Sequence, residues 1–323
     1  MRTLLTILCV PLLACMLYSI LQKRAFSFTS SIASRAKMPL APVIVLSHGG
    51  GPMPLLGDPK HKDITYSLKN RVPKILGLGT PSQPKAIILV TAHWQTSTPH
   101  ISSASSHSLL YDYGGFPEES YHLKYPASGD PAVAEEVKAA FSKAGLKPVM
   151  DEHRGWDHGV FVPMLLVDPK GTVPIVQVSI LQSEDPEVHF RMGKALHSLR
   201  SQNIAIIGSG FASFHNLRVM FPLMSSGPNT PESQALIRKS KAFNEALTNA
   251  TLEADQDKRA AALKDWRRFP NSYTMHPDHG GDHFMPLIVC AGAAEDGEKG
   301  RLYTDDFVGV KIYTYYWSTE EVA

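Results

Sequence analysis

Apolar runs separated by polar, turn-forming segments set the pattern of this chain. Four runs of mainly aliphatic and β-branched residues, each too short for a typical buried helix, predict buried strands. They lie at residues 42–46, 86–90, 173–180 and 204–207. Runs that stay apolar without alternating are typical of strands covered on both faces, as in a parallel sheet.

Segments with helical character alternate with these runs. Helices are predicted over residues 65–76, 132–144 and 186–199, and residues 231–267 are charged, rich in alanine and helical. A last run, 308–317, alternates between apolar and polar residues and predicts a closing strand. Strands alternating with helices predict a single α/β domain with a central sheet, mostly parallel or mixed, flanked by helices on both faces.

Composition narrows the function classes. The formal net charge is only +2 over 323 residues, and no stretch interleaves basic and aromatic residues, so nucleic-acid binding is not expected. Two of the three cysteines, Cys9 and Cys15, lie in the apolar N-terminal segment, which leaves Cys290 alone. Neither a disulfide framework nor a cysteine-ligated zinc site is therefore expected. Fourteen histidines favour a metal held by nitrogen and oxygen ligands.

Residues 1–37 are predicted to be a targeting or membrane-anchor leader that is not part of the fold. Residues 4–21 are apolar, whereas residues 25–37 are rich in serine and basic residues and contain no acid. This composition favours a mitochondrial presequence over a secretory signal or a membrane anchor. Translation from Met38 would instead give a cytoplasmic protein. Residues 38–323 form the predicted catalytic domain.

Histidines follow three of the predicted strands. His48 follows the first strand, His93 the second and His215 the strand at 204–207, while His283 lies in a His/Asp cluster before a predicted helix. Open α/β sheets place their ligands at the carboxyl ends of their strands. We expect these four imidazoles to hold one divalent metal ion and to leave positions open for substrate.

His158 has a different context, Gly155-Trp156-Asp157-His158-Gly159. An aspartate cannot easily accept a hydrogen bond from the ring of its own neighbour, so His158 is interpreted as a separate residue that handles protons. A buried structural histidine that anchors a turn is the alternative. The histidines without a glycine or strand-end context are interpreted as surface or packing residues: His61, His100, His107, His122, His153, His189 and His197.

Two loops have the composition of a ligand site. Gly49-Gly50-Gly51 allows close backbone approach to a ligand, although without a Lys-Ser/Thr ending it is not a phosphate-binding loop. Residues 111–117 combine aromatics and glycines, which suits a loop folded over a pocket as well as a plain surface loop.

Seven short segments in order carry a resemblance to a known family. With them the chain resembles the class III (LigB-type) extradiol ring-cleaving dioxygenases, and more closely the branch that includes DOPA 4,5-dioxygenase. The segments are Ser47-His48-Gly49-Gly50-Gly51-Pro52, Thr91-Ala92-His93-Trp94, Gly114-Gly115-Phe116-Pro117, Tyr125-Pro126-Ala127, Trp156-Asp157-His158-Gly159, His215-Asn216-Leu217 and His283-Phe284-Met285-Pro286-Leu287.

The resemblance implies a LigB-like fold and a non-haem metal ion, Fe(II) or Zn(II), that serves cleavage of a catechol ring with O2. It implies that His48 and His93 are ligands and that His283 completes the set. His215 is either a fourth ligand or, like His158, a catalytic residue that moves protons. His276, Trp94 and Asp157 are the residues expected to bind substrate.

The chain departs from the family pattern in one loop. The gap between His276 and His283 is longer than usual and contains Gly280-Gly281, and Asp282 stands where a glutamate is usual. Two other functions stay open. One is a zinc hydrolase, although no His-Glu-x-x-His pattern supplies a general base. The other is a non-catalytic binding protein on the same scaffold.

Overall fold

The chain is described by a computed structural model over residues 39–322, of which residues from Leu40 onward form one compact unit. The leader predicted at 1–37 lies outside the described residues, so its targeting and membrane association stay predictions. Within residues 39–322, none of the helices is both long and apolar enough to span a bilayer.

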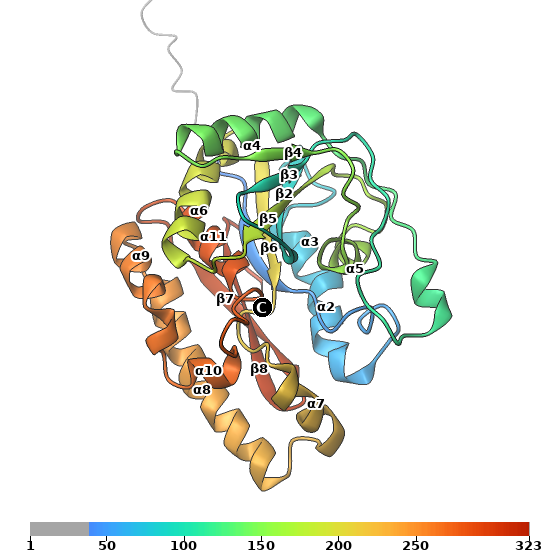
Figure 1. The fold of residues 1–323 in the computed structure, drawn as a ribbon, viewed down its shortest axis with the longest axis vertical. Helices are drawn as coiled ribbons and strands as arrows, with labels where there is room; N and C mark the ends of the chain where they lie inside the picture. The colour runs from blue at the N-terminus through green and yellow to red at the C-terminus, as the bar shows by residue number, and fades with distance from the viewer. Residues whose placement is uncertain (1–38, 323) are drawn as a thin grey trace, which may run out of the picture. The chain divides into compact units, whose positions relative to one another are not determined.

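A sheet of eight strands, counted over the described residues, runs through the unit in the order β4-β3-β5-β2-β6-β1-β8-β7 (Figure 1). The strands are β1 (Val43–Ser47), β2 (Ala86–Thr96), β3 (His100–Ser102), β4 (Val149–Asp151), β5 (Ile175–Leu181), β6 (Ile204–Gly210), β7 (Arg301–Phe307) and β8 (Val310–Trp317).

The sheet is mixed, with a parallel centre. Strands β5, β2, β6 and β1 pair in parallel, whereas β8 is antiparallel to β1, and β3 is antiparallel to β5. All residues of β1, β5 and β6 are buried, as expected for strands with helices on both faces. The predicted α/β fold with a mostly parallel or mixed sheet is confirmed.

Helices cover both faces of this sheet, as Figure 1 shows for α6 and α11 on one side and α2, α3 and α5 on the other. Helices α5 and α11 are apolar on all sides and are almost completely buried. The helices are α2 (Lys62–Asn70), α3 (Val72–Ile75), α4 (Pro131–Lys143), α5 (His158–Val167), α6 (Pro186–Arg200), α7 (Leu217–Ser226), α8 (Pro231–Thr251), α9 (Gln256–Lys264), α10 (Ser272–Met275) and α11 (Met285–Ala293), and the 3-10 turns are η1 (Pro59–His61), η2 (Glu118–Tyr121) and η3 (Trp266–Arg268).

Three of the long helices begin with the same kind of N-terminal cap. The side chains of Asp130, Asp185 and Thr230 accept hydrogen bonds from backbone N–H groups of the first turns of α4, α6 and α8. A proline follows each cap at the first helical position, where a missing N–H costs nothing. These helices therefore start within one residue of the predicted positions.

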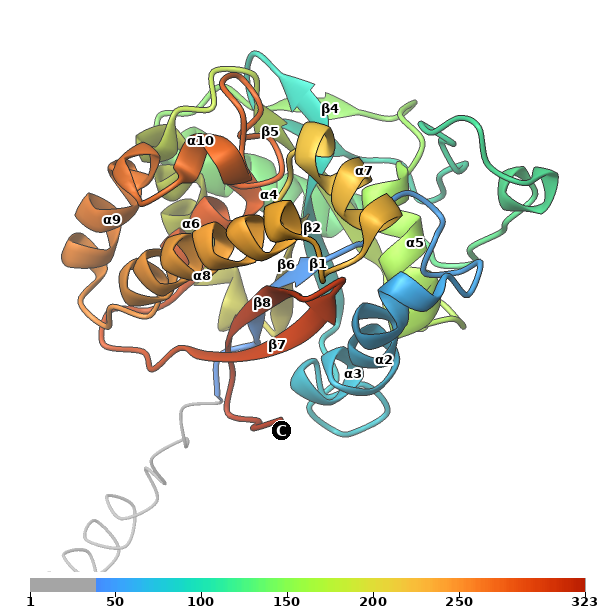
Figure 2. The same cartoon turned by 90° about the horizontal axis from the view of Figure 1, so that it is seen from below.

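The structure differs from the predicted elements in several places; β3, β4 and α5, for example, were not predicted. Strand β2 continues past residue 90 to Thr96, with an irregularity in its pairing. The helix predicted at 65–76 is divided at Arg71 into α2 and α3. Strand β7 was not predicted, because its burial alternates and its charged residues resemble a surface loop. It forms a hairpin with β8, visible at the lower front of Figure 2.

A buried carboxyl on β7 gives the fold a pH dependence. Asp305 accepts hydrogen bonds from Ser67 Oγ at 2.5 Å and from Arg71 Nη1 at 3.1 Å. Burial nevertheless raises the pKa of Asp305 from 3.8 to about 6. Because the folded-state pKa lies above the unfolded one, the stability linked to this proton is complete below pH 3.8 and is lost as the pH rises through about 6.

Asp305→Asn is therefore expected to gain stability relative to the wild type as the pH rises from 4 to 8. A shift of about two pKa units corresponds to a relative gain of about 1 to 3 kcal/mol. Urea unfolding at both pH values measures it, with Glu245→Gln, an exposed carboxyl on α8, as the matched control. An equal effect of both substitutions across the pH range would contradict the role of Asp305.

Candidate active site

Two histidines of the site, His48 and His93, are positioned by central strands of the sheet. His48 follows the last residue of β1, and His93 lies within β2, two strands away in the sheet. Strand β2 pairs with β5 at Thr91↔Ser179 and again at Gln95↔Ile180, so three residues of β2 bulge out between adjacent residues of β5. The bulge brings His93 Nε2 to 3.2 Å from His48 Nε2.

Hydrogen bonding fixes the orientation of the His48 ring. Ser209 Oγ donates to the backbone carbonyl of Gly159 and lies 3.0 Å from His48 Nδ1. Since the hydroxyl proton is used, Ser209 Oγ accepts from His48 Nδ1–H, which leaves the lone pair of His48 Nε2 facing His93. Metal-binding histidines use the same arrangement, with one ring nitrogen donating to an acceptor behind it.

His158 stands at the first turn of α5 and pairs with Asp112. Its Nδ1 lies 2.8 Å from Asp112 Oδ1, which also accepts the backbone N–H of His158 at 2.9 Å. Burial opposes ionisation of Asp112, but these hydrogen bonds outweigh it and lower the pKa of the carboxyl. Asp112 Oδ2 is also 3.6 Å from His93 Nδ1. One carboxylate thus faces two imidazoles.

His215 and His283 come from the other side of the site. Their rings stack with centroids 3.4 Å apart and planes inclined by 14°. His283 approaches the sheet closely because Gly210 lacks a side chain: a Cβ there would lie 2.5 Å from the His283 carbonyl oxygen. The backbone N–H of Phe211 donates to that same oxygen. A glycine on β6 therefore positions a histidine more than seventy residues later in the chain.

All five histidines meet at one edge of the sheet. Ring centroids of His93 lie 4.9 Å from His48, 4.8 Å from His283 and 3.8 Å from His158. Two sets of side chains place one possible ligand atom each within 4.8 Å of one another: His48, His93 and His158, and His215, Asp282 and His283. The structure thus brings together the four histidines that were predicted to converge: His48, His93, His215 and His283.

Burial lowers the pKa of four of these imidazoles, those of His48, His93, His215 and His283. It lowers the pKa of His93 to about 3 and, together with repulsion from neighbouring imidazoles, places the pKa of His48 and of His283 well below 6.5. Burial also lowers the pKa of His215. A metal ion needs unprotonated imidazole, so the ligands would be in their binding form at neutral pH.

The donor set fits a non-haem divalent ion. Two ligands of one tetrahedral or octahedral ion lie about 3.0 to 3.4 Å apart when the metal–nitrogen distance is about 2.1 Å, which matches the 3.2 Å between His48 Nε2 and His93 Nε2. His283 Nδ1 is buried, makes no well-aligned hydrogen bond within the described residues and lies 3.1 Å from Asp282 Oδ1. Imidazole donors without cysteine suit iron or zinc.

A cavity of about 400 Å³ opens onto this cluster. The His61 ring lies against the glycine loop: its Nδ1 is 2.6 Å from Asp58 Oδ2, and its Nε2 accepts the backbone N–H of Gly50 at 3.1 Å. The cavity is lined by His48, Gly49, Gly50, Gly51, Met53, His61, His93, Tyr113, Phe116, His158, Phe211, His215, Leu217, Met220, Phe221, Met224, Asp282, His283 and Phe307.

Three residues expected to bind substrate do not line this cavity. Trp94 is buried beside the bulged His93, and its ring lies 4.8 Å from the Arg154 guanidinium. Asp157 is fully buried and accepts hydrogen bonds from Thr91 Oγ1 and Gln177 Nε2. These contacts tie α5 to the sheet, so both residues support the site from behind it.

His276 is the third of these residues. Its Nε2 donates to the Ala212 carbonyl at 2.8 Å, and its ring packs against Trp266 and Phe284. The side chain is fully buried, and burial lowers its pKa to about 3. In this structure His276 therefore packs in the loop before His283 and does not line the cavity, so its contact with substrate stays a prediction.

Sequence reasoning missed Asp112 and the part played by His61. His61 was interpreted as a packing residue; it is buried, but it also orients the glycine loop beside the cluster. The signals were weak: Asp58 and His61 are three residues apart, and Asp112 lies in the aromatic loop that was predicted to fold over a pocket. Tyr113 and Phe116 of that loop do line the cavity.

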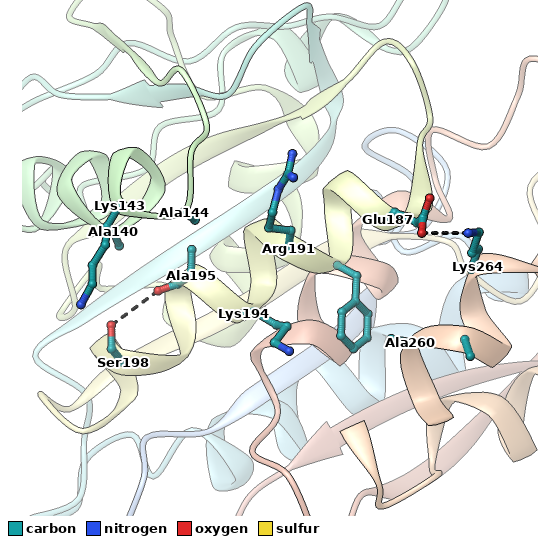
Figure 3. Close-up of a pocket in the computed structure, with 12 residues that line it drawn as sticks. Ala140, Lys143, Ala144, Glu187, Arg191, Lys194, Ala195, Ser198, Ala260 and Lys264 are labelled. Carbon is teal, nitrogen blue, oxygen red and sulfur yellow. Dashed lines mark hydrogen bonds and ion pairs between the residues drawn. The ribbon is translucent and has the colours of Figure 1, made fainter. Parts of the chain in front are cut away.

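A larger cavity, about 830 Å³, lies between α4, α6 and α9. Figure 3 shows its basic side chains, among them Lys143, Arg191 and Lys194, and the ion pair of Lys264 with Glu187 at 2.8 Å. No histidine or cysteine lines it. The metal-binding chemistry is therefore at the strand ends.

The fold and the imidazole cluster together define an α/β protein of the non-haem metal-dependent class. The chain belongs to the LigB family: residues 41–313 match the family model described as "Catalytic LigB subunit of aromatic ring-opening dioxygenase". The resemblance inferred from the sequence motifs is confirmed. A dioxygenase is an oxidoreductase whose substrates are O2 and a small molecule.

Known proteins similar to this chain carry related names. It is 57% identical over 290 residues, 88% of each chain, to the dioxygenase tasH of Hapsidospora irregularis. It is 32% identical to the 4,5-DOPA dioxygenase extradiol of Beta vulgaris, over 70% of this chain and 80% of that one. Among solved structures, an uncharacterized protein from Escherichia coli K12 matches with a TM-score of 0.64 at 25% identity, covering 86% of this chain and 100% of that one.

Proposed function

We propose that this protein is an extradiol dioxygenase that opens the aromatic ring of a catechol with O2, inserting both oxygen atoms next to the diol. The observation that carries the proposal is the meeting of His48, His93 and His283 beside the His158–Asp112 pair, in a chain of the LigB family. The first three would hold the metal ion, Fe(II) or Zn(II), with His215 stacked on His283 as a fourth candidate.

When bound, an Fe(II) ion would supply a Lewis acid that lowers the pKa of the catechol hydroxyls and a path for electrons from the ring to O2. The protein supplies the base. His158 Nδ1–H donates to Asp112, which leaves Nε2 free to accept a proton from a catechol hydroxyl. Ionised Asp112 then stabilises the imidazolium that forms, while the aromatic walls, including Tyr113 and Phe116, exclude water from the ring.

The zinc-hydrolase alternative needs a carboxylate that activates water near the ligands. In the described part of the chain no glutamate lines the cavity, and Asp282 Oδ1 accepts the backbone N–H of His283. These contacts and the family favour ring cleavage. A non-catalytic binding protein would have no need of the oriented His158–Asp112 pair.

Anaerobic loading with Fe(II), followed by exposure to O2 and catechol, tests the proposal. We expect a yellow ring-opened product whose mass exceeds that of catechol by one O2, with equimolar oxygen uptake. Zinc-loaded protein that cleaves esters or amides without taking up O2 would support the hydrolase instead. Binding of catechol without either reaction would support the binding protein.

His158→Gln is expected to keep the metal and to slow ring opening by about 10²- to 10⁴-fold, because it removes a general base. Metal analysis and oxygen uptake measure the two effects separately. His153→Gln, an exposed histidine five residues away, is the matched control. Loss of the metal together with activity would instead make His158 a ligand, as its position beside His48 and His93 also allows.

A further inference from the structure

One face of helix α7 forms an apolar wall of the cavity. Leu217, Met220, Phe221 and Met224 all line it. Their spacing of three, one and three residues places them on a single side of the helix. Asn216 caps the start of α7 by accepting the backbone N–H of Arg218, directly after His215. The helix thus runs outward from the candidate metal centre.

The other walls away from the histidines are apolar as well. They are formed by Met53 beside the glycine loop, Phe116 of the aromatic loop, Phe211 after β6 and Phe307 of β7. Tyr113 adds a ring, and its hydroxyl donates to the Ser120 carbonyl at 2.6 Å. Beyond the imidazoles, a ligand would therefore meet carbon and sulfur atoms almost everywhere.

Two of these apolar side chains are left largely open to solvent. Phe221 is 62% exposed and Leu217 is 49% exposed, although both line the cavity. Exposed large apolar side chains grouped at the mouth of a cavity are typical of a ligand-binding surface. A substrate that extends from the metal centre along α7 would cover them.

No lysine or arginine lines the cavity in the described part of the chain. Cations close in sequence to lining residues do not line the cavity themselves: Lys60 and Lys62 flank His61, Arg218 lines a separate hollow between α7 and α8, and Arg154 Nη2 donates to Asp157 and to the His93 carbonyl. A substrate carboxylate in this cavity would lose water without gaining an ionic partner, which is costly.

A substrate ammonium group would also find few ionic partners in the cavity. Asp282 is the one carboxylate among the lining residues. Its Oδ1 accepts the backbone N–H of His283 at 2.8 Å, and its Oδ2 accepts from Gln95 Nε2 at 3.4 Å. It also lies among the imidazoles, grouped with His215 and His283 at the end of the cavity where the diol would bind.

From this arrangement we propose that the substrate is a catechol with a bulky, uncharged, apolar substituent that lies along the Leu217–Met224 face of α7. The inference rests on the proposed ring cleavage and adds its substrate class. It excludes an amino-acid side chain such as that of DOPA as the favoured substituent. Helix α7 is then the element that determines specificity.

Comparison of four catechols tests the inference: catechol itself, 4-butylcatechol, L-DOPA and dopamine. Each methylene that is buried favours binding by about fourfold. We expect kcat/KM for 4-butylcatechol to exceed that for catechol by at least about 10-fold and that for L-DOPA or dopamine by at least about 100-fold.

The outcomes for the two proposals are separate. If catechol is cleaved but L-DOPA or dopamine is used as well as 4-butylcatechol or better, the substrate inference is overturned and ring cleavage stands. If none of the four is cleaved by Fe(II)-loaded protein, ring cleavage itself fails. Tight binding of 4-butylcatechol without cleavage, measured by calorimetry, would support the proposed apolar specificity and contradict the proposed ring cleavage.

A variant on α7 tests the wall directly. Phe221→Lys places a cation at the mouth at a position that is already exposed, so the fold is expected to tolerate it. The ratio of kcat/KM for 4-butylcatechol to that for L-DOPA should fall by about 10-fold or more. Ser225→Lys adds the same charge to an exposed position of α7 that does not line the cavity, and should leave the ratio unchanged. Equal ratios in both variants would overturn the role of this face.

Discussion

Replacing His93 by alanine is expected to abolish metal binding and ring cleavage together, with turnover lower by at least about 10³-fold. His93 stands in the bulge of β2, its Nε2 is 3.2 Å from that of His48, and its ring is close to those of His158 and His283. A site that loses one of three protein ligands holds a divalent ion poorly and in the wrong geometry. Metal content after dialysis and oxygen uptake with catechol measure both effects.

His122→Ala is the control for that experiment, because this imidazole is 71% exposed and pairs at 3.0 Å with Glu118 of η2. It should leave metal content and turnover unchanged. A His93→Ala protein that keeps one metal ion per chain and full activity would show that the metal is held elsewhere. Zinc and iron should be tested in parallel, since imidazole ligands accept both.

Gly193→Ala is expected to destabilise the fold by about 1 to 3 kcal/mol, although alanine is the better helix former. Gly193 lies inside α6, and a Cβ there would stand 1.9 Å from the Val289 carbonyl oxygen of α11. On the facing helix, a Cβ at Gly292 would lie 2.2 Å from the Phe190 carbonyl oxygen. Both contacts are with backbone atoms, which cannot rotate away, so α6 and α11 would have to move apart.

Denaturant unfolding measures this effect. Gly114→Ala is the matched control, because a Cβ at Gly114 would meet no atom within 4 Å and its backbone does not need a positive φ. Helix α11 begins two residues after His283, so the Gly193 variant should also weaken metal binding in any fraction that folds. A Gly193→Ala protein as stable as the wild type would mean that the two helices are packed less closely than their backbones indicate.

Much of the fold follows from local sequence. Continuous apolar runs predicted the central strands, and caps such as Asp130 and Asp185 predicted helix starts, because both signals depend on neighbouring residues. Strand β7 was missed because it is a charged segment in which alternate residues become buried only when it pairs with β8. That burial is decided by pairing, which periodicity does not reveal.

The candidate site divides in the same way. Sequence selected His48, His93, His215 and His283 from fourteen histidines by their strand-end and cluster contexts, and the structure brings these four together. It also places His158 beside them, which the sequence had separated from the ligands. Trp94, Asp157 and His276 were expected to bind substrate from the family resemblance, and none of them lines the cavity. Each is held by contacts outside the cavity: Trp94 with Arg154, Asp157 with Thr91 and Gln177, and His276 with the Ala212 carbonyl.

The sequence by itself determined the family, the order of the strands' apolar runs and the residue types able to hold a metal. Only the tertiary structure decided that a bulge in β2 turns His93 toward His48, that Asp112 is the partner of His158 from 46 positions away, and that α7 lines the cavity with an apolar face. The reason is physical. Local patterns record which residues favour a strand or a helix, whereas a site is made by contacts between segments distant in the chain, whose geometry depends on how the whole sheet and its helices pack.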